Sequence, residues 1–150
     1  MSTRNSQLAT DNSLLSTVNW KLATVLFAYM ALLAYASLRP ISPEAAEGIS
    51  GTRRAVNNLL HVPAYAVLAG LWMLVLSKSD TPARRLRTIV FGGLIAVLFG
   101  AVMEALQGLV VPGRMCGWED FGLNTLGAAL AAAAMLIWAK RKSKTPVTRD

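Results

Sequence analysis

Residues 88–111 read TIVFGGLIAVLFGAVMEALQGLVV, an apolar run interrupted by Glu104 and, three residues later, by Gln107. The run is long enough to cross the hydrocarbon core of a bilayer, which takes roughly 20 residues of α-helix. A carboxyl group inside such a run is costly, and ionisable groups within membranes are usually paired, turned toward the protein interior and functional. We therefore expect a membrane-spanning helix here, and we expect Glu104 to belong to any site that the protein has.

Three further apolar blocks of similar length occur in the chain, at about Trp20–Leu38, Leu59–Leu76 and Phe121–Ala139. Over the whole chain 15% of residues are charged, which is below the roughly 25% typical of soluble domains. A soluble bundle would carry a polar stripe along each helix, but residues 22–38 contain no charged side chain. The sequence predicts an all-α fold, an integral membrane four-helix bundle over residues 20–139.

The basic residues are distributed unevenly around these blocks. Eleven of the 15 Lys and Arg residues precede residue 22, lie between residues 78 and 87, or follow residue 139. The other four lie in the two remaining loops and are Arg39, Arg53, Arg54 and Arg114. By the positive-inside rule this predicts that both termini, a flexible tail over residues 1–19 and a basic tail over residues 140–150, are cytoplasmic. Topology thus accounts for the net charge of +7, and we expect no nucleic-acid partner.

Polar residues within the apolar blocks are predicted to form one layer. His61 and Tyr65 are four residues apart, as are Asp120 and Asn124, so each pair shares a helix face. At 1.5 Å per residue, Glu104 lies roughly 10 Å from the outer end of its helix. Three helices therefore place polar groups at similar depths, all toward the outward side.

Small residues continue the same helix faces. Three glycines lie on the same helix face as Glu104: Gly93, Gly100 and Gly108. Gly100 precedes Glu104 by four residues and Gly108 follows it by four, while Gly93 lies seven residues before Gly100. Four small residues follow Asn124 at helical spacing, Gly127, Ala128, Ala131 and Ala134. Small residues let membrane helices approach closely. We expect both faces to pack inward and to carry the polar groups with them.

These residue types suit two kinds of chemistry. Candidates for acid–base catalysis are His61, the only histidine, together with Glu104 and Asp120, because such groups exchange protons when they are suitably placed. Candidates for ligand binding are Tyr65, Gln107, Arg114 and Asn124. A structural interpretation also stays open, since a carboxylate such as Asp120 suits a helix N-terminus.

Several classes of site are not predicted. A single histidine and the lone Cys116 do not give a metal-ligand spacing, and one cysteine excludes an intrachain disulfide. The sequence contains no nucleophile motif and no glycine-rich phosphate loop. We predict neither a metal nor a cofactor.

Two segments resemble the VanZ-like family of small bacterial membrane proteins. Residues 57–65, NNLLHVPAY, resemble the family's D-K-x-x-H-x-x-x-Y stretch. Its E-x-x-Q…R…D-x-x-x-N-x-x-G pattern is matched in order by Glu104, Gln107, Arg114, Asp120, Asn124 and Gly127. Asn57 and Asn58 stand where the family usually has Asp and Lys, so that charge pair is absent here.

The resemblance implies a multi-pass protein of the bacterial cytoplasmic (inner) membrane, part of the cell envelope. The family's namesake is linked to teicoplanin resistance, and the implied partners are a membrane lipid, a cell-wall precursor or a glycopeptide. The first hypothesis is an outward-facing polar pocket that binds one of these. The alternative is a membrane enzyme that acts on a lipid head group through His61 and Glu104. A proton-coupled carrier fits less well, because the polar groups lie on one side only. The sequence sets no oligomeric state.

Overall fold

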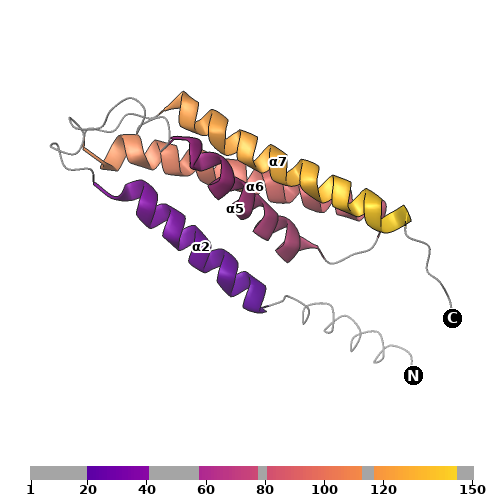
Figure 1. Cartoon of the computed structure of the whole chain (residues 1–150). Helices are drawn as coiled ribbons and strands as arrows, with labels where there is room; N and C mark the ends of the chain where they lie inside the picture. Colours follow the sequence, from indigo (N-terminus) through magenta and orange to yellow (C-terminus); the bar gives the residue numbers. More distant parts are fainter. Residues whose placement is uncertain (1–19, 41–57, 78–80, 113–116, 145–150) are drawn as a thin grey trace, which may run out of the picture.

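The computed structural model describes residues 20–40, 58–77, 81–112 and 117–144, and within them the fold is all-helical. The four helices are α2 (Trp20–Leu38), α5 (His61–Leu76), α6 (Pro82–Val110) and α7 (Trp118–Lys144). They run alternately up and down, so that α2 begins and α7 ends at the same end of the bundle (Figure 1). The predicted all-α bundle of four helices is confirmed.

Helix length divides the four elements into two classes. By length and composition, three helices are able to cross a membrane: α2, α6 and the part of α7 up to Arg141. The fourth helix, α5, is apolar but has only 16 residues, or about 24 Å at 1.5 Å per residue. That is shorter than the roughly 30 Å hydrocarbon core, so α5 matches the thickness of a bilayer less well than its neighbours do.

Two helices extend beyond the apolar blocks into basic sequence. Helix α6 begins at Pro82, ahead of the run that starts at Thr88, and α7 continues to Lys144. Proline suits the first turn of a helix because its missing N–H would have no partner there. Lys and Arg are good helix formers, so the basic segments continue the helices instead of ending them.

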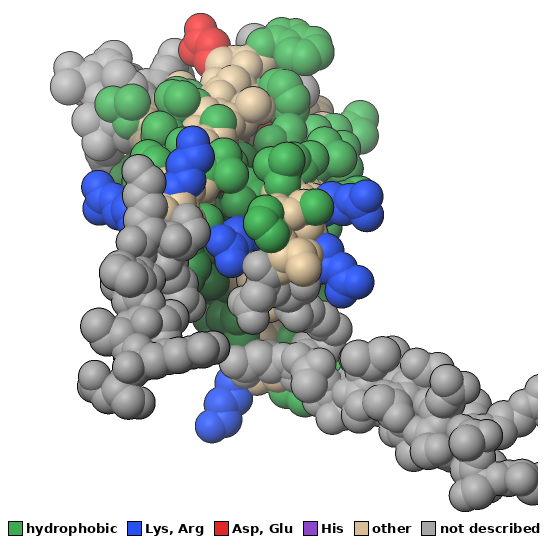
Figure 2. Space-filling model, turned by 90° about the vertical axis from the view of Figure 1, so that its right-hand side faces the viewer, with side chains coloured by type: hydrophobic (Ala, Val, Ile, Leu, Met, Phe, Trp, Pro, Cys, Tyr) green, Lys and Arg blue, Asp and Glu red, His purple; other side chains and the backbone are tan. Residues whose placement is uncertain are grey.

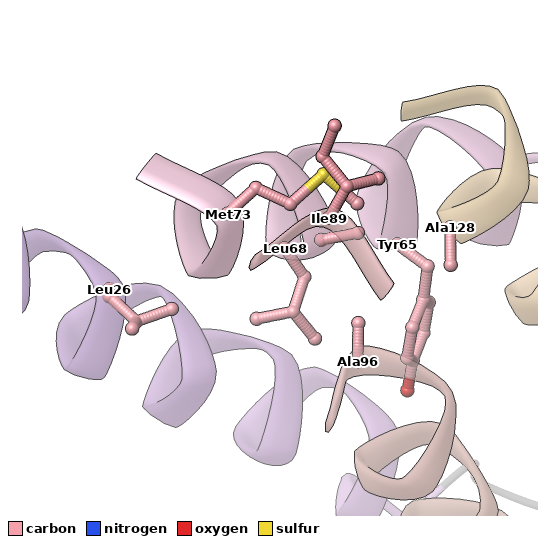
Figure 3. Close-up of a cluster of buried hydrophobic side chains, with 8 residues drawn as sticks. Leu26, Tyr65, Leu68, Met73, Ile89, Ala96 and Ala128 are labelled. Atoms are coloured by element: carbon pink, nitrogen blue, oxygen red, sulfur yellow. The ribbon is translucent and has the colours of Figure 1, made fainter. Parts of the chain in front are cut away.

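Helices α5 and α6 form the centre of the bundle. Each of them packs against the other three helices, whereas α2 and α7 do not touch each other within the described ranges. Figure 3 shows the apolar core where the helices meet, with side chains from all four. Its labelled residues are Leu26, Tyr65, Leu68, Met73, Ile89, Ala96 and Ala128.

Two glycines let α6 and α7 pack directly onto the backbone of α5. A Cβ added at Gly92 of α6 would lie 2.8 Å from Met73 Cγ and 2.9 Å from the Met73 backbone nitrogen. A Cβ added at Gly127 of α7 would overlap the Val62 carbonyl oxygen and lie 3.0 Å from the Ala66 backbone nitrogen. Gly92 and Gly127 therefore serve the contacts of α6 and α7 with α5.

The inward faces follow the predicted ones for part of their length. On α6 the buried face includes Gly92, Ala96, Gly100 and Glu104, but Gly108 is exposed. On α7, Asn124, Gly127 and Ala128 are buried, but Ala134 is exposed. The inward orientation predicted for Gly108 and Ala134 was wrong. With 3.6 residues per turn, steps of three or four residues drift around the helix, so a stripe extrapolated over several steps leaves the buried face.

Charge separates the two ends of the bundle. Figure 2 views the end where α2 begins and α7 ends, and Lys and Arg side chains surround it. We call it the basic end, and its described side chains are Lys21, Arg84, Arg85, Arg87, Lys140 and Arg141. The acidic residues in the described ranges are Glu104, Glu119 and Asp120, and all lie in the opposite half of their helices.

Candidate functional site

One hydrogen bond joins two of the predicted site residues across the bundle. His61, the first residue of α5, places Nδ1 at 2.9 Å from Oδ1 of Asn124 on α7. Asn124 is fully buried, with 0% of its surface exposed, and His61 is partly buried. An amide inside a membrane helix needs polar partners, and the imidazole supplies one of them.

Tyr65 lies one helical turn beyond His61 and stacks on it. The two rings are parallel within 2°, with centroids 6.3 Å apart. Tyr65 is only 3% exposed, and its hydroxyl lies within electrostatic reach of the Glu104 carboxyl on α6. Tyr65 therefore extends the site from His61 into the buried interior of the bundle.

Gly100 is the point at which α5, α6 and α7 come together. A Cβ at this position would lie 2.9 Å from Tyr65 Cε1 and 3.0 Å from Asn124 Nδ2. Glu104 follows one turn later on α6 and Gln107 three residues after that, and each is 3% exposed. We call His61, Tyr65, Glu104, Gln107 and Asn124 the polar cluster.

Asp120 lies at the edge of the polar cluster. It occupies the first turn of α7, one turn before Asn124, where the helix dipole favours a negative charge. Its Oδ1 atom is buried and has no hydrogen-bond partner in the described part of the chain. The position thus agrees with a structural role for Asp120 at the N-terminus of α7. The buried oxygen, however, is also an acceptor beside the polar cluster.

Helix lengths set the depth of the polar cluster. Asn124 lies six residues after the start of α7, and Glu104 lies six residues before the end of α6. At 1.5 Å per residue, both helices extend about 9 Å beyond the cluster along their axes. The cluster therefore lies inside one end of the bundle, opposite the basic end.

Two residues that build this region were not predicted to belong to the site. Gly100 was expected to aid helix packing, but not to contact two members of the polar cluster. Tyr29 of α2 donates its hydroxyl hydrogen to the Ala64 carbonyl oxygen of α5 at 3.0 Å. Its signal was a phenol within an apolar block, because a tyrosine hydroxyl needs a hydrogen-bond partner when it is buried. Of the predicted site residues, Arg114 lies outside the described residues, as does Cys116.

The Gly100→Ala variant is expected to lose about 1–3 kcal/mol of stability, the usual cost of overpacking. Its methyl group would force Tyr65 or Asn124 to move. Thermal unfolding in detergent measures the loss. Gly70→Ala on α5 is the matched control, since nothing lies within 4 Å of a Cβ there. Equal melting temperatures for the two variants would contradict the close contact at Gly100.

Comparison with known proteins identifies the family of the chain. A protein-family model described as VanZ/LLP1 matches residues 2–139, which include all four apolar blocks and the polar cluster. Neither the curated proteins nor the solved structures contain a match to the chain. Because the family match extends over most of the sequence, from the first residues to the end of the last apolar block, the chain belongs to the VanZ/LLP1 family.

Proposed function

We propose that the polar cluster binds the head group of an envelope lipid, a cell-wall precursor or a glycopeptide. The observation that carries this proposal is the Asn124 side chain. Its oxygen faces His61, while its nitrogen Nδ2 is buried and has no hydrogen-bond partner among residues 20–40, 58–77, 81–112 and 117–144. A buried donor without a partner costs about 1–3 kcal/mol. A ligand that brings an acceptor would recover this energy.

The residue types in and beside the cluster favour an amphiphilic ligand. Asn124 Nδ2 offers a donor, whereas Glu104 and Asp120 offer acceptors. Arg114, which the sequence places in the adjoining loop, suits a phosphate or carboxylate, because a guanidinium binds either one bidentately. Lipids, lipid-linked precursors and lipophilic glycopeptides all combine such a polar group with a chain that suits the apolar helix surfaces. This shared chemistry defines the proposed ligand class.

We further propose that the basic end faces the cytoplasm, in the bacterial inner membrane, and that the polar cluster faces outward. The positive-inside rule supports this orientation, because the described Lys and Arg side chains other than Arg39 gather at one end (Figure 2). Alkaline phosphatase, which is active only outside the cytoplasm, should be active when inserted within residues 41–57. It should be inactive when fused after Lys144, where green fluorescent protein should fluoresce. The reversed pattern would contradict the orientation.

Binding can be tested with purified protein in nanodiscs. The probes are phosphatidylglycerol, phosphatidylethanolamine, undecaprenyl phosphate and teicoplanin, with native mass spectrometry as the readout. Asn124→Leu removes the buried donor and should weaken binding of the preferred probe about tenfold, the loss of one hydrogen bond. Arg114→Ala should weaken the binding of the anionic probes in particular. Thr125→Val is the control, because Thr125 is exposed and its hydroxyl donates to the Phe121 carbonyl one turn earlier on the same helix. Unchanged binding in both variants would count against the proposal.

The second candidate function is an enzyme that acts on a lipid head group. The hydrogen bond from His61 to Asn124 favours it, because a base oriented by a fixed neighbour is a common arrangement in acid–base catalysis, worth about 10²–10⁴-fold in rate. Glu104 and Asp120 would supply the acid. A deletion strain carrying wild-type protein would be compared with one carrying His61→Ala by lipidomics. Identical lipid and precursor profiles would remove the support for catalysis.

A further inference from the structure

We infer that Asn124 is a positioning residue that holds His61 in the tautomer protonated at Nδ1, so that Nε2 accepts a hydrogen bond from the ligand. The Asn124 oxygen is an acceptor only, and it lies 2.9 Å from Nδ1. The imidazole hydrogen must then be on Nδ1. The ligand part of this inference rests on the proposed function, whereas the tautomer does not.

The orientation of the Asn124 amide follows from its surroundings on α6. Nδ2 points toward Gly100, since a Cβ there would lie 3.0 Å from it. One turn further along α6 lies the buried Glu104 carboxyl. An amide turned the other way would direct its oxygen toward the helix that carries this acceptor, and its NH₂ toward the imidazole. The orientation in which the Asn124 NH₂ group faces α6, the helix that carries Glu104, is therefore the electrostatically favourable one.

Two side chains neighbour the imidazole, Asn124 and Tyr65. Asn124 is fully buried against Gly100, so its oxygen cannot move far from His61. Tyr65 lies parallel to the imidazole, with ring centroids 6.3 Å apart. The hydrogen bond to Asn124 occupies Nδ1 of the imidazole. Nε2 is therefore the nitrogen that remains for a ligand.

A neutral Nε2 atom selects the ligand by what it can donate. It accepts a hydrogen bond and cannot bind a bare anion oxygen. The matching ligand carries an O–H or N–H group next to its phosphate or carboxylate. Phosphatidylethanolamine and phosphatidylglycerol have such a group, whereas phosphatidylcholine has the same phosphate but no hydrogen to donate. The site thus predicts a hydroxyl- or ammonium-bearing head group.

Selective ¹⁵N labelling of histidine tests the tautomer without any ligand. The chain has a single histidine, so protein purified without a polyhistidine tag gives the spectrum of one imidazole. At a pH well above the ordinary histidine pKa of about 6.5, we expect Nδ1 to be the protonated nitrogen. Asn124→Leu should shift the majority to the Nε2–H form, while Asn124→Asp, which keeps an acceptor, should retain Nδ1–H. Thr125→Val should leave the spectrum unchanged.

Two results would overturn the positioning role: an Nε2–H majority in the wild-type protein, or an unchanged Nδ1–H spectrum in Asn124→Leu. If Asn124→Leu does not fold, a Nε2–H majority in Asn124→Asp has the same meaning. The ligand part is tested separately in nanodiscs. The wild type should prefer phosphatidylethanolamine over phosphatidylcholine by about tenfold, the value of one hydrogen bond, and His61→Ala should abolish this preference. Equal binding in the wild type would overturn the ligand part and leave the tautomer standing.

Discussion

The Gly127→Ala variant is expected to lose about 3 kcal/mol of stability or more, at the upper end of the cost of overpacking, although it adds a single methyl group. That methyl would overlap the Val62 carbonyl oxygen and lie 3.0 Å from the Ala66 backbone nitrogen. Both atoms belong to the backbone of α5, so no side-chain rotation can relieve the contact. The two helices would have to move apart.

Separation of α5 and α7 would also damage the polar cluster. Val62 follows His61 directly, and Gly127 lies three residues after Asn124. A shift large enough to admit the methyl group would therefore lengthen the 2.9 Å contact between His61 and Asn124. We expect Gly127→Ala to lose ligand binding together with stability, even though Gly127 has no polar side chain.

The measurement is unfolding in detergent, by temperature or by increasing sodium dodecyl sulfate, with size-exclusion profiles at each step. Gly122→Ala provides the matched control on the same helix, because no atom lies within 4 Å of a Cβ at that position. Alanine is favoured over glycine in a helix by about 1 kcal/mol, so this control should be neutral or slightly stabilising. Similar unfolding profiles for the two variants would disprove the close contact between α5 and α7.

The presence of the helices could be predicted, because hydropathy alone identifies segments such as Trp20–Leu38 that suit a bilayer. Their ends were harder to predict. Hydropathy marks where apolar sequence stops, not where backbone hydrogen bonding stops, and α7 therefore continues through basic residues to Lys144. The short length of α5 was not expected either. The apolar block begins at Leu59, but the helix begins two residues later, at His61, so the block is longer than the helix.

Part of the candidate site could also be predicted. Helical spacing put His61 and Tyr65 on one face, and the structure stacks their rings. The pairing of His61 with Asn124 depends on how α5 and α7 are rotated and shifted along their axes relative to each other. The loop sequences do not predict this rotation or this shift. Likewise, spacing identified Gly100 and Gly127 as packing positions, but could not tell that both contact α5.

The Glu104→Gln variant is expected to keep or gain stability while losing ligand binding. Glu104 is 3% exposed and lies about 9 Å from the end of α6. A charge in such a place costs free energy through its desolvation, whereas glutamine keeps the size and one acceptor oxygen without a charge. Hydrogen bonds to charged groups contribute about 1.5–3 kcal/mol. Removing the charge should thus weaken the binding of a head group that donates a hydrogen bond to Glu104, by roughly ten- to a hundredfold.

The experiment compares Glu104→Gln with Glu119→Gln, which makes the same chemical change at an exposed position at the start of α7. Exposed substitutions of this kind usually alter stability by less than about 0.5 kcal/mol. Unfolding in detergent and lipid binding in nanodiscs are measured for both. A functional carboxyl predicts unchanged or higher stability with weakened binding for Glu104→Gln alone. Lower stability with unchanged binding would instead make Glu104 a structural group. Such a carboxyl holds the helices together, and the costly charge in the apolar run would then serve the fold.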